Sequence, residues 1–114
     1  FRERFLRAAN QHVRLDTNGH AALMYTGRDI VAELKKAGLD AVSVSLNAES
    51  EEKYNRLCKP VFEGSYVALL DFTKKAIAAG IRTRMTVVQQ PDIDIIKCER
   101  IATGLGASFK VRGG

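Results

Sequence analysis

The chain has 114 residues, of which 46% are hydrophobic and 27% are charged, and it carries a formal net charge of +5. These values indicate one globular domain. No apolar run approaches the roughly 20 residues that a membrane-spanning helix needs, so no membrane partner is expected. The basic residues are scattered along the chain rather than gathered in one run, which favours a solvated surface over a nucleic-acid interface.

The chain opens at Phe1, inside a stretch with the apolar spacing of a helix, so we expect a fragment of a longer protein. No signal peptide is visible, which indicates a cytoplasmic protein. The two cysteines, Cys58 and Cys98, fall in separate segments with helical patterns. Such a pair is typical of free thiols in the cytosol, and its spacing does not indicate a zinc site.

Strand and helix patterns alternate along the chain. Four segments with apolar–polar alternation or apolar runs are expected as strands: residues 12–16, 41–48, 81–89 and 108–112. Five segments with apolar residues three and four apart are expected as helices: residues 2–10, 30–37, 50–57, 64–79 and 94–105. Thr26 to Asp29 has capping-box spacing, and Ser50 and Asp94 are expected N-caps. This order is typical of βαβ units and predicts a parallel sheet.

The second expected strand has one apolar and one polar face. Residues two apart share a face, which groups the side chains into two sets: Val42, Val44 and Leu46, and Ser43, Ser45 and Asn47. A β/α barrel explains this pattern, because its helices cover the apolar side of each strand while the polar side faces a ligand cavity. An ordinary surface strand with solvated serines is the alternative.

Polar residues gather at the expected carboxyl ends of the strands, where parallel α/β folds bind their ligands. These ends are residues 16–19, 45–48, 88–91 and 112–114. They offer amides and hydroxyls but no nucleophile–base pair, and no glycine-rich phosphate loop is present. His20 follows the first end, either as a functional or as a solvated residue. We therefore assign no catalytic residue and no metal ligand, and expect a cofactor to carry the chemistry.

Several segments carry more specific motifs, namely Val13–His20, Val42–Ala48, Tyr54–Pro60, Thr86–Val88, Pro91–Asp94 and Phe109–Arg112. With them the chain resembles the C-terminal half of a radical S-adenosylmethionine (SAM) protein, most closely of the group associated with the TatD family of nucleases. The resemblance runs from about residue 12 to the end. The Ser-Leu-Asn strand followed by Tyr-Asn-x-Leu-Cys-x-Pro is its most specific part, and the Thr-Asn-Gly turn is common.

The resemblance implies a fold and a chemistry. The fold is α/β: residues 1–114 form the C-terminal half of a partial (β/α) barrel, a half-barrel fragment with about four parallel strands and flanking helices. In this family SAM and a [4Fe–4S] cluster generate a 5′-deoxyadenosyl radical, which attacks a substrate that is unknown here. The chain lacks the family's Cys-x3-Cys-x2-Cys loop and Gly-Gly-Glu-type strand. We therefore expect neither cofactor on this fragment, which alone should be inactive.

The resemblance also implies ligand-contacting positions. Thr17 and Asn18 match the turn near the cofactor, and Ser45 and Asn47 match the positions that contact the ribose and carboxylate of SAM. Gln89 occupies the zone that surrounds adenine. These five residues are the candidate cofactor-binding set.

A self-standing α/β module that binds a nucleotide or an anion without catalysis is the alternative function. A half-barrel would also expose unpaired strand edges and apolar surface, so the fragment is expected to associate as a homo-oligomer.

Overall fold

The computed structural model describes residues 14–20, 28–60 and 63–112. Strands in these ranges are β1 (Arg14–Thr17), β2 (Ala41–Ser45), β3 (Arg82–Val88) and β4 (Ser108–Arg112). Helices in the same ranges are α2 (Ile30–Lys36), α3 (Glu51–Cys58), α4 (Ser65–Ala78) and α5 (Ile95–Leu105). The expected helix at 2–10, the start of the first expected strand and Thr26 lie outside the described residues.

Within these ranges, the four strands form one parallel sheet in the order β1-β2-β3-β4. Each strand therefore lies beside the strand that follows it in the sequence. The register aligns Asp16, Ser43 and Arg84 across the first three strands. The predicted α/β class, with four parallel strands and flanking helices as in a partial barrel, is confirmed.

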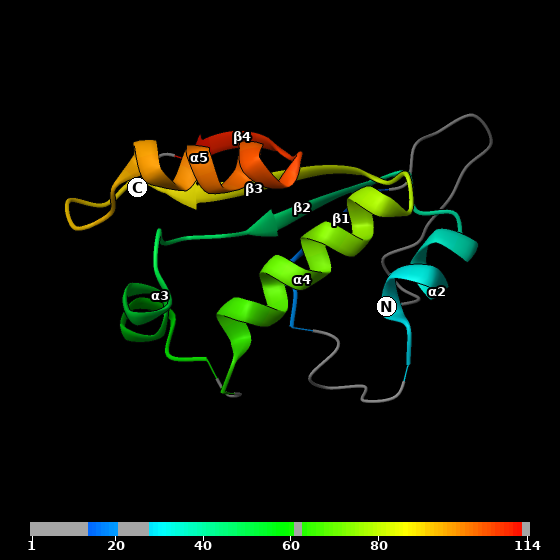
Figure 1. The fold of residues 1–114 in the computed structure, drawn as a ribbon, viewed down its shortest axis with the longest axis horizontal. Coiled ribbons are helices and arrows are strands. Elements are labelled where there is room, and N and C mark those ends of the chain that lie inside the picture. Colours follow the sequence, from blue (N-terminus) through cyan, green and yellow to red (C-terminus); the bar gives the residue numbers. More distant parts are fainter. Residues whose placement is uncertain (1–13, 21–27, 61–62, 113–114) are drawn as a thin grey trace.

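Among the described helices, α4 and α5 contact the sheet, and both lie on the same face of it (Figure 1). Helix α4 packs on β2 and β3, and α5 packs on β3 and β4. The side chains of Val44 on β2 and Leu69 on α4 both lie next to Gly19, so the apolar face of β2 points toward α4. Because side chains alternate along a strand, Ser43 and Ser45 point to the opposite face.

Local side-chain caps explain where the helices begin. The Ser50 hydroxyl accepts a hydrogen bond from the Lys53 amide at 3.3 Å, and the Asp94 carboxylate accepts one from the Lys97 amide at 3.1 Å, as predicted. At α2 the N-cap is Asp29, three positions later than the capping-box motif predicts. None of the helices in the described ranges has the length and hydropathy that crossing a bilayer requires.

Candidate functional site

The structure brings the five candidate residues to one edge of the sheet. Thr17 and Asn18 lie at the end of β1, Ser45 and Asn47 at the end of β2, and Gln89 directly after β3. All these ends meet at the same edge because the strands are parallel. We call this edge, with the turns that follow it, the carboxyl rim.

The first turn of the rim is fixed by its own side chains. The Thr17 hydroxyl accepts a hydrogen bond from the Gly19 amide at 3.1 Å, and the Asn18 side-chain oxygen accepts one from the His20 amide at 3.0 Å. Hydroxyl and amide side chains stabilise turns in this way. Both candidate residues therefore have a structural role in the turn, independent of any ligand.

The second turn of the rim differs from the prediction, because β2 ends at Ser45 rather than Ala48. The Leu46 and Asn47 amides both donate to the Thr86 carbonyl oxygen, at 2.9 and 3.3 Å. The Ala48 amide then donates to the Leu46 carbonyl at 2.8 Å, and Asn47 has a φ of 64°. This is a γ-turn of the rare positive-φ form, which strains a residue other than glycine.

Asn47 therefore does not continue the polar face of β2. Its side-chain amide donates a weak hydrogen bond to the sulfur of Cys58 at 3.7 Å, which joins the turn to the end of α3. Ser45 is half-buried and is the last residue of the strand's polar face. Gln89 is exposed, and its backbone amide donates to the Arg112 carbonyl at 3.1 Å.

Behind the rim, a chain of buried rings connects the turns. His20 Nε2 lies 2.7 Å from the Tyr54 hydroxyl, and His20 is only 8% exposed. The Tyr54 and Tyr66 rings pack with centroids 5.3 Å apart, and the Tyr66 hydroxyl donates to the Ala48 carbonyl at 3.0 Å. Burial, with a smaller effect of Cys58, raises the pKa of Tyr54 to about 12, so this hydroxyl stays protonated. His20 is therefore a packed residue, not a solvated one.

Burial also lowers the pKa of His20 below its usual value of 6.5, which predicts a pH-dependent stability. The unfolded chain takes up a proton as the pH falls through 6.5, before the folded chain does, so acidification favours unfolding. One such histidine changes the free energy of unfolding by at most about 1.4 kcal/mol per pH unit. We expect the melting temperature to fall on acidification from pH 7, and less so in His20→Gln.

An NMR titration tests directly whether the pKa of His20 is lowered. The sequence holds two histidines, so a His12→Gln variant leaves His20 as the source of the remaining imidazole signals. We expect a titration midpoint below 6.5. A midpoint at or above that value would show that burial does not control this histidine.

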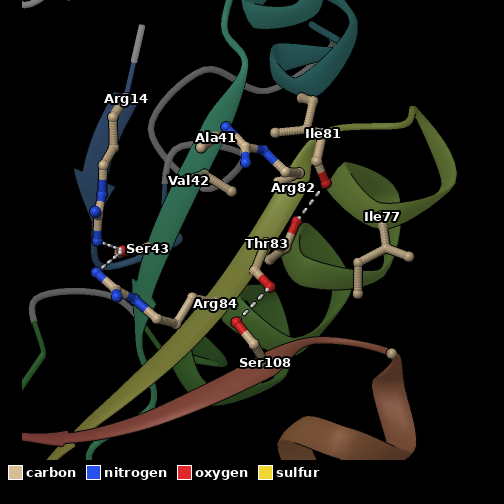
Figure 2. A pocket seen from close by; sticks show the side chains of 11 residues that line it. Arg14, Ala41, Val42, Ser43, Ile77, Ile81, Arg82, Thr83, Arg84 and Ser108 are labelled. Atoms are coloured by element: carbon tan, nitrogen blue, oxygen red, sulfur yellow. Dashed lines mark hydrogen bonds between the residues drawn. The ribbon is translucent and has the colours of Figure 1, made fainter. Parts of the chain in front are cut away.

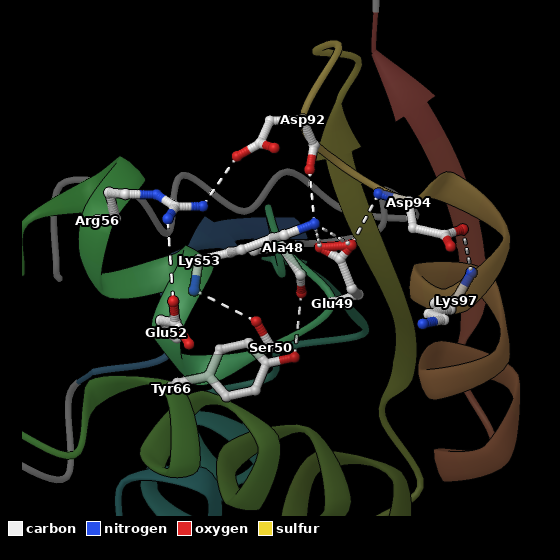
Figure 3. Close-up of polar contacts among 10 residues, drawn as sticks. All are labelled: Ala48, Glu49, Ser50, Glu52, Lys53, Arg56, Tyr66, Asp92, Asp94 and Lys97. Atoms are coloured by element: carbon white, nitrogen blue, oxygen red, sulfur yellow. Dashed lines mark hydrogen bonds and ion pairs between the residues drawn. The ribbon is translucent and has the colours of Figure 1, made fainter.

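A buried carboxylate ties two turns of the rim together, and the sequence patterns did not reveal it (Figure 3). The side chain of Glu49 is 7% exposed. Its Oε2 accepts hydrogen bonds from the Asp94 amide at 2.8 Å and from Lys53 Nζ at 3.3 Å. Lys53 Nζ also donates to the Asp92 carbonyl at 2.8 Å. The turn after β2 is thus joined to the turn after β3.

The hydrogen bonds that the Glu49 carboxylate accepts favour its ionised form. Burial favours the neutral acid, but the hydrogen bonds from the Asp94 amide and Lys53 outweigh burial and hold the pKa below its usual value. Oε1 lies 3.2 Å from the Lys53 ammonium, although at an angle that does not make a hydrogen bond. Glu49 is therefore a buried carboxylate that stays ionised near neutral pH.

A cavity of about 690 Å³ lies toward the amino ends of the strands, away from the rim (Figure 2). Its polar lining includes Arg14, Ser43, Arg82, Arg84 and Ser108. None of the five candidate residues lines it. No pattern in the sequence indicated a cavity at this end of the sheet.

The parallel sheet, with α4 and α5 packed on one face and polar turns at the carboxyl rim, is consistent with a partial (β/α) barrel. Such barrels bind ligands at the carboxyl ends of their strands. The sequence matches the description "Radical SAM superfamily" over residues 1–98. The chain belongs to this superfamily. No curated protein matches the chain.

The superfamily uses SAM and an iron–sulfur cluster, and the described residues do not suit the cluster. Such clusters are held by several cysteine thiolates. Cys98 is fully buried, and burial raises the pKa of its thiol to about 11. Across the described ranges, no group of three or more histidine, cysteine or acidic side chains can hold a metal ion. The hydroxyls and amides of the rim can, by contrast, donate and accept hydrogen bonds to a polar ligand.

Proposed function

We propose that this chain is the C-terminal half of a radical SAM domain and supplies part of the SAM and substrate cavity. When bound together, SAM and a [4Fe–4S] cluster held by an upstream half supply radical hydrogen-abstraction chemistry. The match to the superfamily over residues 1–98 carries the proposal. It is supported by the edge position of β1 in the described sheet, where strands of an upstream half can add.

In this proposal the rim residues bind and orient SAM. Ser45 and Asn47 hydrogen-bond its ribose and carboxylate, Thr17 and Asn18 border it, and Gln89 lies near adenine. The hydrogen bonds from the Leu46 and Asn47 amides to the Thr86 carbonyl hold the Asn47 turn in place before any ligand binds. A turn that is ordered in advance loses less entropy on binding, which supports a binding role for this strained residue.

We also propose that the chain belongs to the group of radical SAM proteins associated with the TatD family. The Ser-Leu-Asn motif at residues 45–47 and the Tyr-Asn-x-Leu-Cys-x-Pro motif at residues 54–60 support membership of the group associated with the TatD family. In the structure these two motifs are joined by the Asn47–Cys58 hydrogen bond. The substrate is not specified by these residues.

Substitution at the rim tests the proposal. In the full-length gene product, we expect Ser45→Ala and Asn47→Ala each to weaken SAM binding about tenfold, because each removes a hydrogen bond to a polar or charged ligand group. Calorimetric titration with SAM gives the affinity, and release of 5′-deoxyadenosine under reducing, anaerobic conditions gives the activity. Thr103→Ala, on the exposed side of α5, is the matched control and should bind SAM normally.

Two results would contradict the proposal. One is an upstream coding sequence without a Cys-x3-Cys-x2-Cys loop. The other is an unchanged affinity for SAM in both rim variants, which would place the cofactor elsewhere.

A further inference from the structure

Two arginines converge on one serine on the face of the sheet opposite to helix α4 (Figure 2). Arg14 Nη2 on β1 donates to the Ser43 hydroxyl oxygen at 2.7 Å, and Arg84 Nη2 on β3 donates to it at 3.3 Å. Ser43 on β2 is itself only 3% exposed. The parallel register places these three residues on neighbouring strands, so the arrangement follows from the fold rather than from a flexible loop.

Among the described residues, this cluster carries more positive than negative charge. Arg14 Nε lies 3.8 Å from an Asp16 oxygen, a long contact between side chains that are 48% and 66% exposed. No acidic side chain of the described residues lies within 4 Å of the Arg84 guanidinium, and its buried Nε has no hydrogen-bond partner there. Two guanidinium groups on one oxygen repel each other, and a buried donor without a partner is unfavourable.

The donors are positioned for an oxyanion. The Ser43 oxygen accepts from both arginines, so its own hydrogen can be donated elsewhere. All three residues line the cavity of about 690 Å³, and Arg82 adds a third guanidinium to its wall. Guanidinium groups bind carboxylate and phosphate with two parallel hydrogen bonds, which is their strongest mode of recognition.

We propose that Arg14, Ser43 and Arg84 form a subsite for the carboxylate or phosphate group of a ligand. The subsite lies two residues before Ser45 on the same face of β2, a separation of roughly 7 Å along the strand. A molecule held at the carboxyl rim can therefore reach it with an anionic end. To that extent the inference rests on the proposed function, and it defines the unknown substrate as an anion.

Anion titration of the full-length gene product tests the subsite. Inorganic phosphate and malonate are compared with sodium chloride at equal ionic strength, and binding is followed by calorimetry and by the melting temperature. We expect phosphate, malonate or both to raise the melting temperature above the chloride control, and the effective anion identifies the ligand group. Equal melting temperatures in all three salts would overturn the inference.

A variant that lacks the charge of one arginine shows where the anion binds. We expect Arg84→Gln to weaken the effective anion about tenfold or more, because a hydrogen bond to a charged group is lost. Without anion, the same variant should melt no lower than the wild type, since the repulsion with Arg14 is relieved. Arg100→Gln, an exposed residue of α5 with the same change in charge, is the control and should keep wild-type affinity.

The remaining outcomes are also decisive. Wild-type affinity in Arg84→Gln, or an equal loss in Arg100→Gln, would show general charge attraction and overturn the subsite. Should Arg84→Gln not fold, Arg14→Gln must show the loss. The anion titration needs neither SAM nor a cluster, so it can fail while SAM binding at the rim holds, and it can succeed while SAM binding fails.

Discussion

Replacing Gly19 with alanine should lower the free energy of unfolding by about 2–4 kcal/mol, the largest loss that we expect from a single methyl group in this protein. Gly19 has a φ of +78°, a conformation that L-residues rarely adopt. A Cβ atom there would lie 2.8 Å from Leu69 Cβ and 2.9 Å from Leu69 Cα. The Cα belongs to the backbone of α4, so the helix itself would have to move away from the sheet.

Two other glycines distinguish the two causes of this loss of stability, the positive φ and the close packing against α4. Gly64 has a φ of +75°, but an added methyl group would meet no atom within 4 Å, so Gly64→Ala should lose only about 1 kcal/mol. Gly104 lies within α5, also with open space around it, and Gly104→Ala should gain about 0.5–1 kcal/mol. Urea unfolding gives all three values. If Gly19→Ala lowers the free energy of unfolding no more than Gly64→Ala does, Gly19 does not pack closely against α4.

Neutralising Glu49 is the second large expected effect. Glu49→Gln keeps the volume but removes the charge that the Asp94 amide and Lys53 satisfy, so we expect a loss of about 2 kcal/mol near pH 7. The folded pKa of Glu49 lies below 4.5, so this contribution is present above pH 4.5 and is lost as the pH falls through the folded pKa. The difference between wild type and variant should therefore shrink in acid.

An exposed glutamate of the neighbouring helix provides the control. Glu52 lies 3.9 Å from Arg56, and its side chain is 87% exposed. Exposed pairs contribute little, so Glu52→Gln should change the free energy of unfolding by less than about 0.5 kcal/mol. Chemical denaturation at several pH values measures both variants. Equal losses in the two would mean that Glu49 does not join the turns of the rim.

Local patterns were sufficient to predict most of the elements. The last strand has the predicted bounds, and the Ser50 and Asp94 caps act as expected. Each of these features depends on residues within a few positions of one another, and the alternation of strands with helices then restricts the sheet to parallel pairing. The α/β class was therefore predictable from the sequence.

Features that depend on distant residues were not predictable in this way. Strand β2 ends early because the Thr86 carbonyl binds two successive amides of the next turn. Glu49 looked like a residue near the start of a helix, yet its carboxylate is fixed by the Asp94 amide. His20 looked like a loop residue, yet it packs on Tyr54. No spacing rule connects such partners, because only the folded chain brings them together.

The order of the sheet also bears on how the protein is made. Strands that are neighbours in space are neighbours in the sequence throughout the described part of the chain. Each new strand can therefore find its place on a surface that already exists as the polypeptide leaves the ribosome, without waiting for later segments. Parallel pairing across long crossovers, such as that of Ala41 with Arg82, is slow, but each pairing here needs only the preceding strand. This topology therefore favours stepwise assembly from the amino-terminal side during translation.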